Sequence, residues 1–342
     1  MEQLYEDKIS HKVAGSQYIE FLARKPENIE DLVHNEQLMS LLTRTLKNDF
    51  KKSRDLCLNI TRAFFCFSNY TNFHAALTES GIGRITLRVC ELEIYRYSQF
   101  IVKDLVRLER IARVRQRGDR EKSSMWDGVS ESVYTRHGEL VPKEKVDVGR
   151  ELRNIREVVH KQDNLLFVSF HVLLNLAENR SVEKKMARKN IIVFLCDCLD
   201  REWHAGNAEL GMLLVTFLKR LSVTDTHRQN MVSNHAIIAR LSVFFPDSED
   251  GGGGGGGGGG KGDRRSRKKR SLQYRLKKEP WRLPVTHMVL RLLLNLSFEP
   301  VARANMIEKG LVPQLAGMLK VCVCVCVCVW LCCCVLLWFD EP

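Results

Sequence analysis

A pattern of small residues recurs along the chain and constrains its fold more than any other feature. In each copy a small residue, here called the marker residue, ends an apolar run, and Leu or Met follows nine residues later. Two intervals between successive marker residues are 45 residues, and the other two are longer. The sequence therefore predicts a repeat of about 45 residues with two insertions. The pairs are Ala23 with Leu32, Ser68 with Leu77, Ala177 with Met186, Ser222 with Met231, and Ser297 with Met306.

Each repeat is predicted to contain helices only. Leu166, Phe170 and Leu173 follow the 3.6-residue period, with further apolar residues on their flanks, which indicates a helix buried on most sides. Helix-only units of this length predict an all-α fold, an armadillo-type helical repeat superhelix (solenoid) with two low-burial insertions. An ordinary helical bundle is the alternative, but a bundle has no reason to keep the nine-residue offset. The predicted helix stops, where a left-handed residue is expected, are Gly81, Asn190, His235 and Gly310.

The predicted boundaries follow the repeat and the two insertions. Armadillo repeats are expected at residues 1–91, 162–246 and 283–320. Residues 92–161 are charged and carry apolar residues at helical spacing, which predicts a projecting helical hairpin with a polar break at 118–142 and a disordered tip. Residues 247–282 are Gly-rich and basic, so a disordered insertion is expected there. The apolar hairpin positions are Ile101, Leu105, Leu108, Ala112, Leu152, Ile155 and Val159.

The last segment, residues 321–342, is a low-complexity Val/Cys tail. Alternating Val and Cys is what a run of the dinucleotide GT encodes, so the tail is interpreted as translated intron sequence. By length alone Val321–Phe339 is also a transmembrane candidate, and a genuine tail anchor is the alternative.

Charge and cysteine content narrow the functional classes. The net charge is +12, but residues 261–282 carry 11 basic and 2 acidic residues, which leaves only +3 for the rest of the chain. Such a balance disfavours nucleic acid or a membrane surface as a partner of the folded part, although Arg264–Arg270 resembles a nuclear localisation patch. Five cysteines lie inside apolar helical stretches, which is typical of reduced core thiols in a cytoplasmic protein. They are Cys57, Cys66, Cys90, Cys196 and Cys198.

No catalytic motif is complete. Gly255–Lys261 resembles the start of a phosphate-binding loop, but Gly262 stands where Ser or Thr must hold the metal. Cys196, Cys198 and His204 lack a fourth zinc ligand. We therefore expect no enzyme activity, no cofactor, no metal and no small-molecule substrate.

The predicted binding surface is a ladder of side chains on the inner helix of each repeat. In armadillo stacks the residue two before the marker faces the groove, and the residue one turn earlier shares that face. Asn in such a row can hydrogen-bond an extended peptide, whereas Arg and His favour acidic side chains. Equally, Asn175 and Asn295 could satisfy neighbouring helix ends, and both interpretations stay open. The ladder residues are Arg62, Cys66, His171, Asn175, Thr216, Arg220, Arg291 and Asn295.

Several phrases resemble the armadillo region of the kinesin-associated protein family. They lie at 22–38, 64–74, 173–191, 217–222 and 290–300, for example LLNLAENRSVEKKMARKNI from Leu173 to Ile191. The resemblance implies a non-catalytic adaptor subunit of a heterotrimeric kinesin. Its partners would be the motor subunit tails and cargo adaptors, and it would act on the cytoskeleton, including the cilium. A nuclear import adaptor is the alternative armadillo class. Such receptors carry Trp one turn before the ladder Asn, where this chain has Arg62, His171, Thr216 and Arg291.

Overall fold

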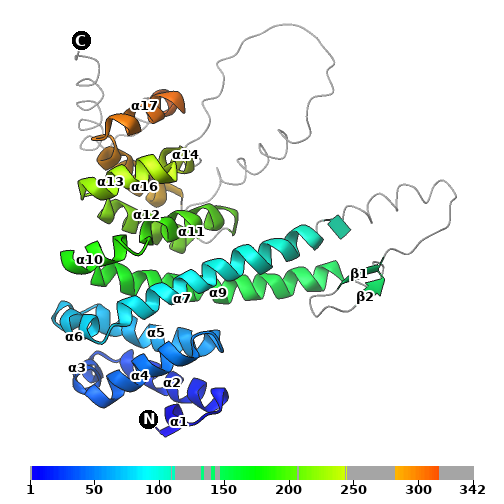
Figure 1. Ribbon diagram of the computed structural model, residues 1–342, viewed down its shortest axis with the longest axis vertical. Coiled ribbons are helices and arrows are strands. Elements are labelled where there is room, and N and C mark those ends of the chain that lie inside the picture. The colour runs from blue at the N-terminus through cyan, green and yellow to red at the C-terminus, as the bar shows by residue number, and fades with distance from the viewer. Residues whose placement is uncertain are drawn as a thin grey trace, which may run out of the picture. The chain divides into compact units, whose positions relative to one another are not determined.

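The computed structural model describes residues 2–108, 110–111, 132–134, 140–142, 147–205, 208–242, 244 and 282–315 (Figure 1). The chain forms two compact units, residues 1–184 and 185–342. The predicted glycine-rich insertion (except Arg282) and the Val/Cys tail both lie outside the described residues.

Helices joined by short turns make up the first unit. The helices that end at or beside a marker residue, α2, α5 and α9, pack against one another in sequence order. Shorter helices return the chain between them. The elements are α1 (Glu2–Tyr5), α2 (Ile9–Ala23), α3 (Pro26–His34), α4 (Glu36–Asp49), α5 (Arg54–Ser68), the 3₁₀ turn η1 (Thr71–Phe73), α6 (His74–Glu79), α7 (Ile82–Arg96) and α9 (Val148–Leu176). Helix α10 (Arg180–Ala187) follows α9.

Local sequence signals explain several of the helix starts. Asn35 accepts a hydrogen bond from the backbone N–H of Leu38 at 2.9 Å and begins α4, while Ser53 does the same for Leu56 at 3.2 Å and begins α5. Pro26 stands at the first position of α3, where its missing N–H costs nothing. Fully buried aromatic side chains, among them Phe64, Phe67 and Phe170, then fix how α5 and α9 pack.

The charged insertion forms a pair of long antiparallel helices, as Figure 1 shows. The outgoing helix is α7, which continues through the π-turn η2 (Tyr97–Ile101) into helical residues 102–108, and the returning helix is the first half of α9. We call this pair the hairpin stem. Ile101, Leu108, Ile111 and Ile155 form its core, with Leu105, Leu152 and Val159 packed against them. The apolar positions expected to face each other therefore do so, except Ala112, which lies outside the described residues.

A buried charge holds the root of the hairpin stem. The Glu93 carboxylate is 1 % exposed and accepts hydrogen bonds from Arg54 at 2.8 Å, Arg96 at 2.6 Å and the Gln162 amide at 2.8 Å. These partners belong to α5, α7 and α9. Because a buried carboxylate is stable only when it is fully paired, this cluster couples the direction of the stem to the repeats beneath it.

Two short strands interrupt the predicted polar break. Strand β1 (Ser132–Tyr134) pairs antiparallel with β2 (Leu140–Pro142), with Val133 opposite Val141. The sequence predicts a polar break with a disordered tip here, and the two strands correct that prediction. Val133, Tyr134 and Val141 are residues of high β-propensity, and three-residue segments are too short to show alternation in a sequence.

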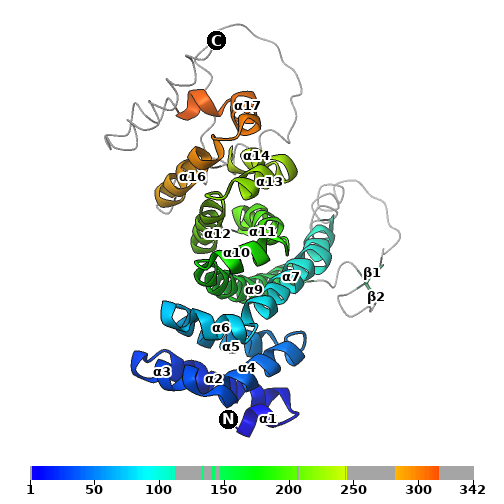
Figure 2. The same ribbon diagram turned by 60° about the vertical axis from the view of Figure 1, so that its left-hand side comes forward.

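The second unit repeats the same arrangement. It contains α11 (Ile191–Ala205), α12 (Ala208–Leu221), α13 (Asp225–His235), α14 (Ile237–Ser242), α16 (Arg282–Leu296) and α17 (Pro300–Glu308), followed by helical residues 311–315 (Figure 2). Helix α12 packs against α16, and α14 packs against α11 and α17. Both units are thus built from helical repeats, and the chain has an all-α, armadillo-like fold.

The left-handed helix stops occur where predicted in three repeats of four. Gly81, Asn190 and Gly310 have φ values of 75°, 61° and 65°. The expectation for His235 is wrong, because α13 runs one residue further and Ala236 takes the positive φ of 44°. The following apolar residue explains the shift. Ile82, Ile191, Ile237 and Leu311 each follow a stop and are fully buried, so burial of this residue sets the stop.

Candidate protein-binding surface

The eight ladder residues fall into two groups of four. Helices α5 and α9 of the first unit carry Arg62, Cys66, His171 and Asn175, and helices α12 and α16 of the second carry Thr216, Arg220, Arg291 and Asn295. Within each group the two helices pack together. The structure thus brings the residues together as two sets of neighbours, one on each unit.

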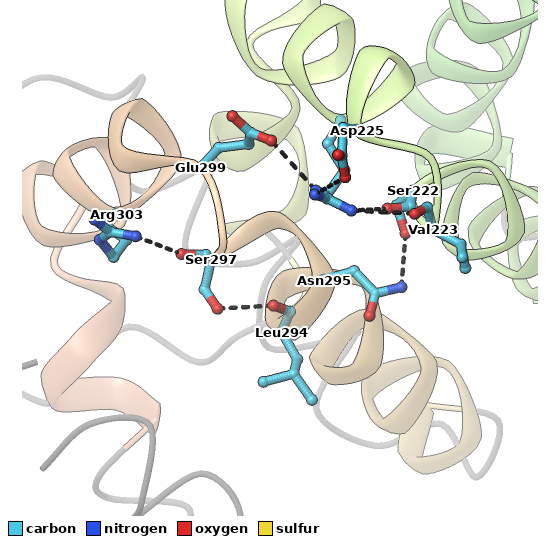
Figure 3. A network of polar contacts seen from close by, with 9 residues as sticks. Ser222, Val223, Asp225, Leu294, Asn295, Ser297, Glu299 and Arg303 are labelled. Atoms are coloured by element: carbon cyan, nitrogen blue, oxygen red, sulfur yellow. Dashed lines mark hydrogen bonds and ion pairs between the residues drawn. The ribbon is translucent and has the colours of Figure 1, made fainter. Parts of the chain in front are cut away.

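The two ladder asparagines bind the preceding repeat. The Asn175 side-chain amide donates to Ser68 Oγ at 3.0 Å and to Asn69 Oδ1 at 3.1 Å. In the second unit the Asn295 amide donates to Ser222 Oγ at 2.8 Å, as Figure 3 shows. The two serine acceptors, Ser68 and Ser222, are both marker residues. Of the two interpretations left open by the sequence, the structure therefore favours asparagines that satisfy a neighbouring helix end.

Each marker serine accepts from the asparagine and also donates its own hydroxyl proton to a carbonyl of the helix that it ends. Ser68 Oγ donates to the carbonyl of Phe65 at 2.9 Å, and Ser222 Oγ donates to that of Lys219 at 2.7 Å. Each clasp is therefore a chain from asparagine amide to serine hydroxyl to a carbonyl in the last helical turn. We call this arrangement the Asn–Ser clasp.

A second recurring contact was missed by the sequence analysis. Six residues after each marker serine stands a side chain that donates to the serine carbonyl. The carbonyl of Ser68 is bound by His74 Nε2 at 2.7 Å, that of Ser222 by Arg228 at 3.2 Å, and that of Ser297 by Arg303 at 3.1 Å. The fixed offset of six was visible in the sequence, but only a Ser marker with a basic residue at that offset forms the contact. The repeats with Ala23 and Ala177 have Ile29 and Glu183 there.

Arg228 is the centre of a network between the fourth and fifth repeats. Its guanidinium also donates to the carbonyl of Val223 at 3.2 Å and to Glu299 Oε1 at 3.3 Å, and it contacts Asp225. It lies 5.8 Å from the ring centre of Phe298. Because both the Arg228 and Glu299 side chains are only 14 % exposed, this ion pair is shielded from solvent.

His171 packs as an aromatic side chain. Its ring lies 5.3 Å from that of Phe65 and 4.7 Å from that of Phe167. Burial lowers the pKa of His171, so the neutral imidazole is the form present at neutral pH. The ladder therefore lacks the positive charge that we allowed for at this position.

Three arginines remain as free donors on the ladder. Arg220 and Arg291 are exposed and Arg62 is half-buried, and none of them forms an ion pair within the described part of the chain. Thr216 Oγ1 donates to the carbonyl of Met212 within its own helix at 2.8 Å. Cys66 is half-buried, and burial raises the pKa of its thiol. The ladder is thus a set of exposed guanidinium groups beside asparagines that already have partners.

The cysteines predicted to be core thiols are buried, except the half-buried Cys66. Burial raises the pKa of Cys57 and of Cys196 to about 12, so both stay protonated and unreactive at neutral pH. Among the residues that the structure describes, no three His, Cys, Asp or Glu side chains are grouped as metal ligands would be. In the same residues no helix is long and apolar enough to cross a membrane.

Comparison with known proteins agrees with this fold. The model of the kinesin-associated protein (KAP) family matches residues 1–251, which is most of the chain. The chain belongs to the kinesin-associated protein family. The matched residues include the first four repeats and the hairpin stem. No solved structure matches the chain.

Proposed function

We propose that this KAP-family chain is a non-catalytic adaptor subunit of a heterotrimeric kinesin. It would hold the tails of the motor subunits and link them to cargo adaptors during microtubule-based transport, including transport in the cilium. The family match over residues 1–251 carries this proposal. A stack of helical repeats supports it physically, because such stacks offer long surfaces for peptides and helices.

We further propose that the free ladder arginines contact the motor tails. Arg220 in the last turn of α12 and Arg291 on the adjacent α16 are exposed, so binding would not disrupt a contact within the fold. Guanidinium groups form paired, charge-assisted hydrogen bonds with carboxylates. An acidic or mixed-charge segment of the tail is the expected ligand. The asparagines beside them would contribute shape rather than amide donors.

Co-purification with motor tails tests the adaptor role. The full chain is immobilised and offered purified tail segments of both motor subunits of a heterotrimeric kinesin. We expect retention of the tails at moderate salt and its loss at high salt, since exposed charges are screened. If neither tail is retained at any salt concentration, the proposed function is wrong.

A charge-reversal pair tests the site within that assay. Arg220→Glu with Arg291→Glu should weaken tail binding by at least about 2 kcal/mol, because lost attraction is joined by repulsion. The matched control is Arg84→Glu with Arg88→Glu, which makes the same change in net charge on an exposed face of α7. Equal weakening by both variants would assign the effect to overall charge and remove the ladder as the site.

A further inference from the structure

Three arginines lie on one side of the returning helix of the hairpin stem. Arg150, Arg153 and Arg156 are all exposed and are spaced three residues apart near the start of α9. Residues at this spacing are neighbours on a helix surface. We call this set the stem arginine face. It is distinct from the ladder, which lies on the last two turns of the same helix and on other helices.

The stem arginine face does not stabilise the fold. No carboxylate in the described residues forms an ion pair with these arginines. Asp147, at the N-cap of α9, attracts Arg150 and Arg153 over a longer distance, while its closest interaction is with the backbone N–H of Arg150 at 3.0 Å. Cations in the first turns of a helix also oppose the helix dipole. The three arginines therefore contribute little to the stability of the fold.

The other charges of the stem are mostly used in local pairs. Arg107 pairs with Glu151 at 3.3 Å, and Lys161 lies 3.8 Å from Asp55. Arg110, on the outgoing helix, is exposed like the stem arginines, and Glu157 is the exposed acid on α9. Basic and acidic residues are nearly balanced over this end of the stem, and the three stem arginines differ from the rest because none of them forms an ion pair among the described residues.

We propose that the stem arginine face binds an acidic, carboxylate-rich segment of a partner protein. Planar guanidinium groups at regular helical spacing match carboxylates that recur along a peptide. Val102 and Val106 on the outgoing helix are about 40 % exposed, and they offer apolar contacts of a kind that a protein segment can use. A protein segment can use these apolar contacts and a phosphate backbone cannot, so we commit to a protein rather than a nucleic acid as the occupant.

Binding of a fluorescent poly-glutamate peptide to the full chain, followed by anisotropy at low salt, tests the proposal. Arg153→Glu with Arg156→Glu should weaken binding at least about tenfold, through lost attraction and added repulsion. Arg84→Glu with Arg88→Glu makes the same change in net charge at the start of α7, the end of the outgoing helix nearer the repeats, and should change affinity by less than about twofold. A similar loss in both variants would overturn the proposal.

Two further measurements distinguish binding by the stem arginine face from binding by the basic run, and a protein ligand from a nucleic acid. The basic run Arg264–Arg270 could itself attract the peptide, so a variant with Lys268, Lys269 and Arg270 changed to Gln is measured in parallel. If only that variant loses binding, the stem arginine face is not the site. If a single-stranded oligonucleotide of equal charge binds more tightly than the peptide and is lost with Arg153→Glu and Arg156→Glu, the ligand class is wrong. Should the reversed variant melt early, Arg153→Gln with Arg156→Gln gives the same decision.

Discussion

The contact between the fourth and fifth repeats around Arg228, here called the joint, and the stem arginine face use the same residue type in opposite ways. At the joint, Arg228 is largely buried and its N–H groups are taken by two carbonyls and the Glu299 carboxylate. On the stem, Arg153 and Arg156 are exposed and form no ion pair among the described residues. What decides the role is the position relative to a helix end. Arg228, at the end of one repeat and beside Glu299 of the next, holds the two repeats together, and an arginine on an open helix face remains available to a partner.

The ladder contains both roles within a few residues. Asn295 is bound to Ser222 of the preceding repeat, whereas Arg291, one turn earlier on α16, is exposed. A ladder that looks uniform in the sequence therefore divides into residues that build the joint and residues that are free to bind. The predictions below test that division, beginning with the largest expected effect.

Replacing Arg228 should destabilise the second unit most. Arg228→Ala removes the donors to Ser222 and Val223 and leaves the shielded Glu299 carboxylate without its cation. We expect a loss of about 2–3 kcal/mol in the free energy of unfolding, measured by chemical denaturation. Arg220→Ala is the control and should cost less than about 0.5 kcal/mol, because its side chain is exposed. Equal losses in the two variants would contradict the division.

The Asn–Ser clasp should give a measurable coupling energy between Asn295 and Ser222 in a double-mutant cycle. Asn295→Ala and Ser222→Ala should each lower the free energy of unfolding by about 1 kcal/mol, because each leaves its partner unsatisfied. The double variant should cost less than the sum by about 1 kcal/mol. Additive losses in this double-mutant cycle would mean that the clasp is not a stabilising contact.

The smallest expected effect is the contribution of His171 to the pH dependence of stability. Because burial lowers its pKa in the fold, the unfolded chain binds more protons below about pH 6.5, and stability falls as the pH drops from 7 to 5. His171→Phe should remove up to about 1 kcal/mol of that fall, measured as melting temperature against pH. The exposed His160→Gln is the control. An unchanged pH profile in His171→Phe would show that the imidazole is not kept neutral.

The repeat could be predicted because it depends on positions that are nearly all buried. Marker residues Ala23, Ser68, Ala177 and Ser222 are at most 1 % exposed, so their size is constrained in every copy. The residue type gave no sign of the helix stop at Ala236, since alanine has no preference for a left-handed conformation. Comparing the residue after the stop, Ile237 against Ile82 and Ile191, would have found it.

The roles of the ladder residues could not be predicted from their type alone. An asparagine can donate to a peptide or to a neighbouring helix, and the choice depends on whether the preceding repeat presents a hydroxyl. Ser68 and Ser222 do so for Asn175 and Asn295. Where the preceding marker is Ala23 or Ala177, the ladder position holds Cys66 or Arg220 instead, a pairing that is visible in the sequence once the clasp is known.

One measurement tests the division between joint and binding residues most directly. Stability and motor-tail affinity are measured on the same two variants of the full chain, Asn295→Ala and the pair Arg220→Glu with Arg291→Glu. The account predicts that Asn295→Ala loses about 1 kcal/mol of stability and keeps its affinity at temperatures where it is folded. It also predicts that the arginine pair keeps its stability and loses at least about 2 kcal/mol of binding. If Asn295→Ala instead loses affinity without losing stability, the asparagine is a binding residue and the account is wrong.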